Sequence, residues 1–379
     1  MKYRKLGRTD LEVSEIAMGC EGFDGKSQTE VDELIDAMHT AGMNFIDLYT
    51  PDPAILKAIG SAIHGRRDAF ILQSHICSVY KDGQYKRSRE TEEVKEAFFQ
   101  RLEQMQTDHF EIGMIHYVDS LKDWQLVKQN VLPMVKEWKK QGLIRYIGLS
   151  SHNPEAALAA LDEIDVLMFS INPCYDLQPG SEDIEKLWAD ESYEKPLLNM
   201  DPSRKKLYEE CAARGIGIDV MKAFGGGDLL HADLSEAKVQ LTPYECISYA
   251  LSRPAVAAVM TGSRSIDELR QNAAYEEAPQ SQKDYTASLM AMPKISWRGH
   301  CMYCGHCAPC PAGINVADVT KLLNLAQVHA SIPETVNEHY MALDHHASEC
   351  IQCRACDGRC PFHVEASMNM KKAAALFGK

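Results

Sequence analysis

Eight of the thirteen cysteines lie close together, between residues 301 and 360. They form two runs of one pattern, in which three cysteines at two-residue gaps are followed by a Cys-Pro pair. The first run is Cys301, Cys304, Cys307 and Cys310, and the second is Cys350, Cys353, Cys356 and Cys360. Three thiolates at this spacing can bind three irons of one cubane, while the Cys-Pro turn directs the fourth away. The pattern predicts two [4Fe–4S] clusters.

The segment resembles a two-cluster ferredoxin domain, in which the fourth cysteine of each run binds the other cluster. This resemblance implies one cluster on Cys301, Cys304, Cys307 and Cys360, and a second on Cys350, Cys353, Cys356 and Cys310. Zinc is the alternative, but a zinc site needs two C-x-x-C pairs rather than a run of three. Disulfides are not expected in a reducing compartment. Because 316–329 and 335–348 have helical character, we expect a small, mainly helical ferredoxin-like domain.

The length and net charge of the whole chain limit the classes of function that it can have. A chain of 379 residues suits a large α/β domain with a small appendage. A net charge of −14 would repel phosphate backbones, so no nucleic-acid partner is expected. No stretch is apolar for the roughly 20 residues that a membrane span needs, and the first residues lack the pattern of a signal peptide. We expect a cytoplasmic protein without a membrane partner, from an anaerobe.

Short β-branched runs alternate with segments of helical period from residue 15 to about 275, which predicts a parallel sheet. The eight expected strands are Glu15–Cys20, Asn44–Tyr49, Ala69–His75, Phe110–His116, Ile144–Ser151, Val166–Asn172, Gly217–Lys222 and Val256–Gly262. Helices are expected between them, one starting at a Ser27 to Glu30 capping box and another over 127–141, and a long loop is expected over 178–201. Eight such units predict a (β/α)₈ TIM barrel over 1–285, followed by the iron–sulfur domain over 286–379.

The barrel segment resembles the aldo-keto reductases. The resemblance rests on the order and spacing of the motifs 3–7, 44–52, 107–116, 142–152, 172–175 and 260–263, with Asn272 further on. It implies an oxidoreductase with a tyrosine as general acid, a lysine held by an aspartate, and a histidine that orients the carbonyl. Asp47 matches the aspartate and His116 the histidine, whereas Asp52 stands at the tyrosine position and His75 at the lysine position. Tyr49 could supply a phenol if its strand continues that far.

The same resemblance implies a nicotinamide cofactor. It places Ser150, Ser151 and Asn172 at the nicotinamide amide, and Gly262, Ser263, Ser265, Glu268, Gln271 and Asn272 around the adenosine phosphate. Glu268 replaces an arginine that in the family holds the 2′-phosphate of NADP, which favours NAD or no nicotinamide at all. Arg264 or Arg270 could still pair with that phosphate, which would permit NADP.

These features favour an iron–sulfur oxidoreductase of the aldo-keto reductase type that acts on a small carbonyl or alcohol. A nicotinamide transfers a hydride, whereas each cluster transfers one electron at a time, so the clusters are either structural or exchange electrons with an outside partner. One alternative is a non-redox lyase, dehydratase or isomerase that uses the His and Asp cluster for acid–base chemistry. Another is an electron-transfer protein whose barrel only docks a partner.

Overall fold

The computed structural model describes residues 1–81, 83–177, 200–232, 239–291, 301, 307–327, 331–360 and 363–379. Most of the long loop expected over 178–201 lies outside the described residues, as does Cys304 of the first cysteine run. Within the described ranges, no helix is both long and apolar enough to cross a lipid bilayer.

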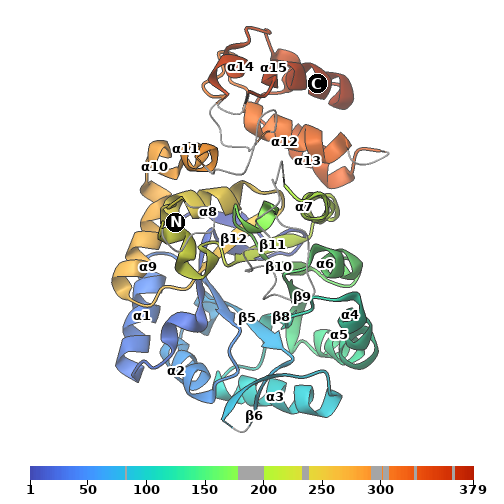
Figure 1. The fold of residues 1–379 in the computed structure, drawn as a ribbon. Coiled ribbons are helices and arrows are strands. Elements are labelled where there is room, and N and C mark those ends of the chain that lie inside the picture. The colour runs from blue at the N-terminus through green and yellow to red at the C-terminus, as the bar shows by residue number, and fades with distance from the viewer. Residues whose placement is uncertain are drawn as a thin grey trace.

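The eight expected strands form one closed parallel barrel (Figure 1). Around the barrel, the strands are β3 (Ile16–Gly19), β4 (Phe45–Leu48), β5 (Ile71–Ile76), β8 (Phe110–Ile115), β9 (Ile144–Ser151), β10 (Val166–Ser170), β11 (Gly217–Met221) and β12 (Val256–Thr261). Strand β12 pairs with β3, which closes the barrel. The predicted (β/α)₈ architecture is confirmed.

Helices surround the barrel on its outer face (Figure 1). They are α1 (Gln28–Thr40), α2 (Pro53–Ile63), α3 (Thr91–Gln104), α6 (Pro154–Ala160), α7 (Pro202–Arg214), α8 (Pro243–Ser252) and α9 (Ile266–Ala273), followed by the short α10 (Gln280–Lys283) and α11 (Thr286–Met290). Helix α1 begins at the predicted capping box, because Ser27 N–H donates to the Glu30 carboxylate while Glu30 N–H donates to Ser27 Oγ. Its apolar stripe, which includes Val31 and Leu34, is buried.

One expected helix differs from the sequence prediction. The segment expected to be one helix over 127–141 is part of three consecutive helical segments, namely α4 (Leu121–Leu126), the π-helical Val127–Val131 and α5 (Leu132–Lys140). Pro133 explains the break, because its nitrogen carries no hydrogen and cannot donate to the preceding turn. The apolar period continues through all three segments, so the sequence pattern alone did not reveal the change in winding.

The barrel interior changes from apolar to polar along strands β4 and β8. Alternate residues of a strand point to the same face. On β4, Phe45 belongs to the apolar interior cluster, and Asp47 is the next residue in phase. On β8, Ile112 and Met114 lie in the same cluster, and His116 follows them. The carboxyl ends of the strands therefore carry the inward-facing polar groups, which is where barrel enzymes have their active sites.

Two hairpins were not anticipated. Strands β1 (Tyr3–Lys5) and β2 (Glu12–Ser14) pair antiparallel, and Leu6 and Val13 from this region belong to the interior apolar cluster. Strands β6 (Ser78–Lys81) and β7 (Gln84–Arg87) pair antiparallel directly after β5. The second hairpin lies at the carboxyl end of a barrel strand, so it can contribute side chains to the active site.

The C-terminal segment contains α12 (Val316–Gln327), α13 (Glu334–Met341), α14 (Ala355–Arg359) and α15 (Ala366–Phe377), which lie at one end of the molecule near α7 (Figure 1). These helices share a small apolar core in which Tyr340 stacks on Phe377. Thr335 Oγ1 donates to the Ala213 carbonyl at the end of α7, 2.7 Å away. The helix expected over 335–348 ends at Met341, and Ala347 N–H donates instead to Tyr340 Oη.

Candidate active site

A chain of polar side chains begins at Asp47 in the barrel interior. His75 Nε2 lies 2.9 Å from Asp47 Oδ1, and His75 Nδ1 lies 2.6 Å from His116 Nδ1. His116 Nε2 lies 2.9 Å from the hydroxyl of Tyr85. Asp47, His75 and His116 were all expected at this site from the sequence, and the structure brings them into direct contact. We call this chain of four groups the proton relay.

The Asp47 carboxylate fixes the direction of every hydrogen bond in the proton relay as long as both imidazoles and the phenol are uncharged. We call this state the neutral relay. Ionised Asp47 only accepts, so His75 Nε2 carries the hydrogen and donates to it. His75 Nδ1 is then an acceptor, and His116 must donate to it through Nδ1–H. His116 Nε2 is therefore an acceptor, and the Tyr85 hydroxyl donates to it. All hydrogens of the neutral relay point toward Asp47.

Burial controls the charge of this region. Burial lowers the pKa of His116 well below its ordinary value, and the neighbouring His75 adds to the effect. Gln73 Nε2 donates to Asp47 Oδ1 at 3.0 Å and approaches Asp219 Oδ1 at 3.3 Å. Burial raises the pKa of Asp219 well above its ordinary value, with the charge of Asp47 as the second cause. Burial thus disfavours the charged forms of both His116 and Asp219.

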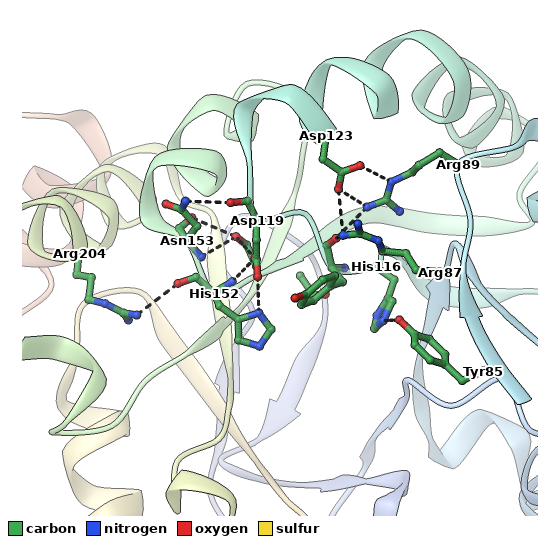
Figure 2. A network of polar contacts seen from close by, with 12 residues as sticks. Tyr85, Arg87, Arg89, His116, Asp119, Asp123, His152, Asn153 and Arg204 are labelled. Carbon is green, nitrogen blue, oxygen red and sulfur yellow. Dashed lines mark hydrogen bonds and ion pairs between the residues drawn. The ribbon is translucent and has the colours of Figure 1, made fainter. Parts of the chain in front are cut away.

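Tyr85 is a site residue that the sequence analysis missed. It lies on β7, and alternation along this strand places Tyr85 and Arg87 on the face toward His116 and Tyr117, as Figure 2 shows for the labelled side chains. A signal was present in the sequence, because Asp82-Gly83 is a typical turn of a two-residue hairpin and Val79, Tyr80 and Tyr85 beside it favour strands. The spatial contact with His116 could not be read from that signal.

Two groups of ion pairs hold the hairpin in place. Glu93 of α3 accepts hydrogen bonds from Lys81, Lys86 and Ser88, each at 2.7 Å. On the other side, Arg89 donates to both carboxylate oxygens of Asp123, at 2.9 and 2.6 Å (Figure 2). A hairpin tied to α3 and to the start of α4 presents Tyr85 to His116 in one position.

A second carboxylate–histidine pair lies next to the proton relay. His152 Nδ1 is 3.0 Å from Asp119 Oδ2, and the His152 backbone N–H donates to Asp119 Oδ1 at 2.7 Å (Figure 2). Burial opposes the ionisation of Asp119, but the hydrogen bonds from His152 outweigh it and lower its pKa. His152 Nε2 is buried and has no hydrogen-bond partner among the described residues. Nε2 is therefore the ring nitrogen of His152 that the Asp119 contact leaves open.

Asp52 and Tyr49 do not join the proton relay. Asp52 is the N-cap of α2, and its Oδ1 accepts from Ala54 N–H at 2.8 Å, a sufficient structural reason for an aspartate there. Strand β4 ends at Leu48, so the condition set for Tyr49, an unbroken strand, is not met. Burial raises the pKa of Tyr49, and the neighbouring Cys20, Glu21 and Asp47 add to the effect.

The residues predicted at the nicotinamide amide are only partly free to bind it. Ser150 Oγ accepts from Tyr117 N–H at 2.9 Å, which leaves its own hydroxyl hydrogen available. Ser151 Oγ already donates within the fold, where it lies 3.1 Å from Asp119 Oδ1. Asn172 Oδ1 accepts from the N–H groups of Cys174 and Tyr175, both at 2.9 Å. Ser150 is the best placed of the three.

The residues predicted around the adenosine phosphate form the turn before α9. Asn272 Nδ2 donates to Ser263 Oγ at 2.9 Å, and Ser265 Oγ caps α9 by accepting from Glu268 N–H. Glu268 Oε2 accepts from Arg264 N–H at 2.7 Å, so the carboxylate already binds a backbone N–H group at the start of the helix. Gly262 is exposed in the same turn, with room beside its Cα. Glu268 would compete with an added phosphate for these amides.

The second predicted cluster corresponds to a hollow in the structure. Cys310, Cys350, Cys353 and Cys356 line it together with apolar side chains that include Ile314 and Met370. Gln352 and Arg354, which separate the cysteines, have left-handed φ angles of 56° and 59°, which give the loop a tight turn. Gln352 Nε2 donates to Cys350 Sγ at 3.2 Å. The four cysteines grouped by the sequence analysis therefore share one hollow.

The first predicted cluster is described only in part. Cys301 and Cys360 both pack against the large barrel-side apolar core, although 59 positions separate them in the sequence. Cys307 packs against the core of the C-terminal helices instead. Across the described residues, no three His, Cys, Asp or Glu side chains converge closely enough to hold a metal ion as they stand. The structure thus does not provide a closed ligand set for either cluster.

A closed (β/α)₈ barrel with histidines and a carboxylate at its carboxyl-terminal end is the architecture of a barrel enzyme. The model of the aldo/keto reductase family matches residues 15–288. The chain belongs to this family and is an oxidoreductase. The family relationship supports the oxidoreductase interpretation and gives no support to the lyase alternative.

Individual relatives agree with this assignment. The uncharacterized oxidoreductase YqkF of Bacillus subtilis is 25% identical over 288 residues, which cover 72% of this chain and 90% of that protein. The aldo-keto reductase YhdN of the same organism is 25% identical over 188 residues, covering 47% of this chain and 53% of YhdN. The holo form of aldo-keto reductase AKR11C1 from Bacillus halodurans has the same fold, with a TM-score of 0.61 and 22% identity over 76% of this chain and 96% of that chain.

Proposed function

We propose that this protein interconverts a small carbonyl compound and its alcohol with a nicotinamide cofactor, and that it carries two [4Fe–4S] clusters in its C-terminal domain. The observation that carries the proposed reaction is the contact chain from Asp47 through His75 to His116. It offers proton transfer at the carboxyl ends of the barrel strands without the tyrosine and lysine of the family tetrad.

A nicotinamide, when bound, would supply or accept the hydride. The free hydroxyl hydrogen of Ser150 suits the carboxamide group, and the turn 262–272 suits the adenosine end. The carboxylate of Glu268 at the start of α9 disfavours a 2′-phosphate, which supports NAD rather than NADP. The residues of this chain bind and orient the two reactants, and the proton relay exchanges the proton.

The donor chemistry of the C-terminal segment fits iron–sulfur clusters. Thiolates are the usual ligands of a [4Fe–4S] cluster, and the shared hollow of Cys310, Cys350, Cys353 and Cys356 supports the crossed assignment of Cys310 to the second run. The first cluster would be bound by Cys301, Cys304, Cys307 and Cys360. We propose that the barrel domain ends at residue 285 and that the iron–sulfur domain follows it.

The clusters are either structural or exchange electrons with an outside carrier. Cys353 is exposed, which would bring the second cluster close to the surface and to such a partner. A hydride carries two electrons and a cluster takes one, so direct exchange between the two would need a converter. We therefore assign the carbonyl chemistry to the barrel alone.

Two measurements on anaerobically purified protein test this function. Fluorescence titration should detect NADH binding, and incubation with NADH and glyceraldehyde, methylglyoxal or acetoin should consume NADH. Iron and sulfide analysis should give about eight of each per chain. Protein that binds no nicotinamide would contradict the proposed reaction, and zinc in place of iron would contradict the proposed clusters.

A further inference from the structure

Tyr85 is the exposed end of the proton relay. Tyr85 is 50% exposed, whereas His75 and Asp47 at the other end are 2% and 4% exposed. The hydroxyl donates its hydrogen to His116 Nε2, so its oxygen still has lone pairs that can accept a hydrogen bond. A substrate hydroxyl that donates to Tyr85 would join the relay without disturbing any other contact in it.

Resting on the function proposed above, we propose that Tyr85 is the catalytic residue that exchanges a proton with the substrate oxygen, and that the His116–His75–Asp47 chain sets the direction of this exchange. The residue comes from the β6–β7 hairpin, not from the strand that carries the family tyrosine. It would thus take over the role of the phenol that is missing at position 52.

In the oxidation direction, the neutral proton relay acts as a base. The substrate hydroxyl gives its proton to the Tyr85 oxygen as the hydrogen of Tyr85 moves to His116 Nε2. A bound oxidised nicotinamide would accept the hydride, with both electrons of the C–H bond, from the substrate carbon. The products are the carbonyl compound, the reduced nicotinamide and a relay that holds one added proton, whose positive charge Asp47 stabilises. Release of this proton to solvent restores the relay.

Reduction is the exact reverse and needs the added proton at the start. The carbonyl carbon receives the hydride, and its oxygen takes the hydrogen of Tyr85 while His116 Nε2–H returns a proton to Tyr85. Since burial lowers the pKa of His116 well below its ordinary value, His116 Nε2 carries no proton at neutral pH and can accept one. Oxidation should therefore be favoured at neutral and alkaline pH, whereas the rate of reduction should rise as the pH falls.

The decisive comparison is between Tyr85→Phe and Tyr80→Phe. Tyr80 pairs with Tyr85 across the same hairpin, so its substitution controls for changes in the hairpin itself. Loss of a positioned acid or base typically lowers the rate by about 10² to 10⁴. We expect Tyr85→Phe to lower kcat for glyceraldehyde reduction at least about 100-fold with NADH binding unchanged, and Tyr80→Phe to change it less than about threefold.

Two further measurements distinguish a catalytic role of Tyr85 from a purely structural one. The double variant Tyr85→Phe/His116→Gln should be no slower than the slower single variant, because the two groups act as one unit. Histidine ¹⁵N NMR, which needs no turnover, should show His116 as the Nδ1–H tautomer, with its Nε2 resonance shifted in Tyr85→Phe.

The outcomes distinguish this inference from the proposed function. If wild type binds NADH and Tyr85→Phe keeps its turnover, or if NMR finds the hydrogen on His116 Nε2, the role of Tyr85 is wrong while the proposed function stands. If wild type binds no nicotinamide, the proposed function and the role of Tyr85 are both contradicted.

Discussion

The Nδ1 atoms of His75 and His116 face each other at 2.6 Å. Only one hydrogen can lie between them, so one ring donates and the other accepts. Two protonated imidazoles would bring two hydrogens and two positive charges to the same contact. Since Asp47 binds the far side of His75, the pair holds at most one added proton. The contact links the charge of the active site to the stability of the barrel.

The first prediction concerns stability at mildly acidic pH. The folded-state pKa of His116 is lowered below its unfolded value, first by burial and then by His75. The unfolded chain therefore binds more protons as the pH falls below about 6.5, and the folded state loses stability in that range. Urea unfolding between pH 7.5 and 5 should show a steeper loss for wild type than for His116→Gln. Parallel curves for the two proteins would mean that His116 is not buried as a neutral group.

The second prediction separates Asp52 from the reaction. Because Asp52 caps α2, Asp52→Ala should lower the free energy of unfolding by about 1 kcal/mol while kcat stays close to that of wild type. Asp52→Ser, which keeps a capping oxygen, is the matched control and should retain most of the stability. A loss of activity in both variants without a loss of stability would restore Asp52 to the catalytic set.

The third prediction concerns cofactor choice. Wild type should bind NADH more tightly than NADPH, because the Glu268 carboxylate occupies an amide at the start of α9. Glu268→Gln removes the charge but keeps an acceptor oxygen, and should strengthen NADPH binding about tenfold, equal to about 1.4 kcal/mol. Glu277→Gln, at another exposed glutamate, should have no such effect. A tenfold preference of wild type for NADPH would show that Arg264 or Arg270 binds the 2′-phosphate.

The fourth prediction tests the crossed pairing of the cysteines. Cys310→Ser should remove about four of eight irons, and these should belong to the cluster of the second run, because Cys310 shares a hollow with Cys350, Cys353 and Cys356. Cys246→Ala, in the barrel core, should leave the iron content unchanged. Electron paramagnetic resonance of the reduced proteins identifies which cluster is lost. Loss of the first cluster alone would falsify the crossed assignment.

The sequence by itself determined the barrel and the types of residues at its mouth. The strand and helix periods follow from which residues must be buried, so all eight barrel strands were predicted. The resemblance to the aldo-keto reductases placed Asp47, His75 and His116 at the ends of these strands. Pro133 changed the winding of one helix without changing its apolar pattern, and such a change leaves little trace in a period.

Only the tertiary structure decided which side chains meet. Tyr85 is 31 positions from His116 in the sequence, and the two touch because Glu93 and Asp123 hold the hairpin over the barrel. Asp52 was matched to the catalytic tyrosine by its position along the chain, and only the structure shows that its side chain caps α2. Periodicity reports which face a residue occupies, whereas distances across a barrel depend on loop paths and ion pairs that have no period.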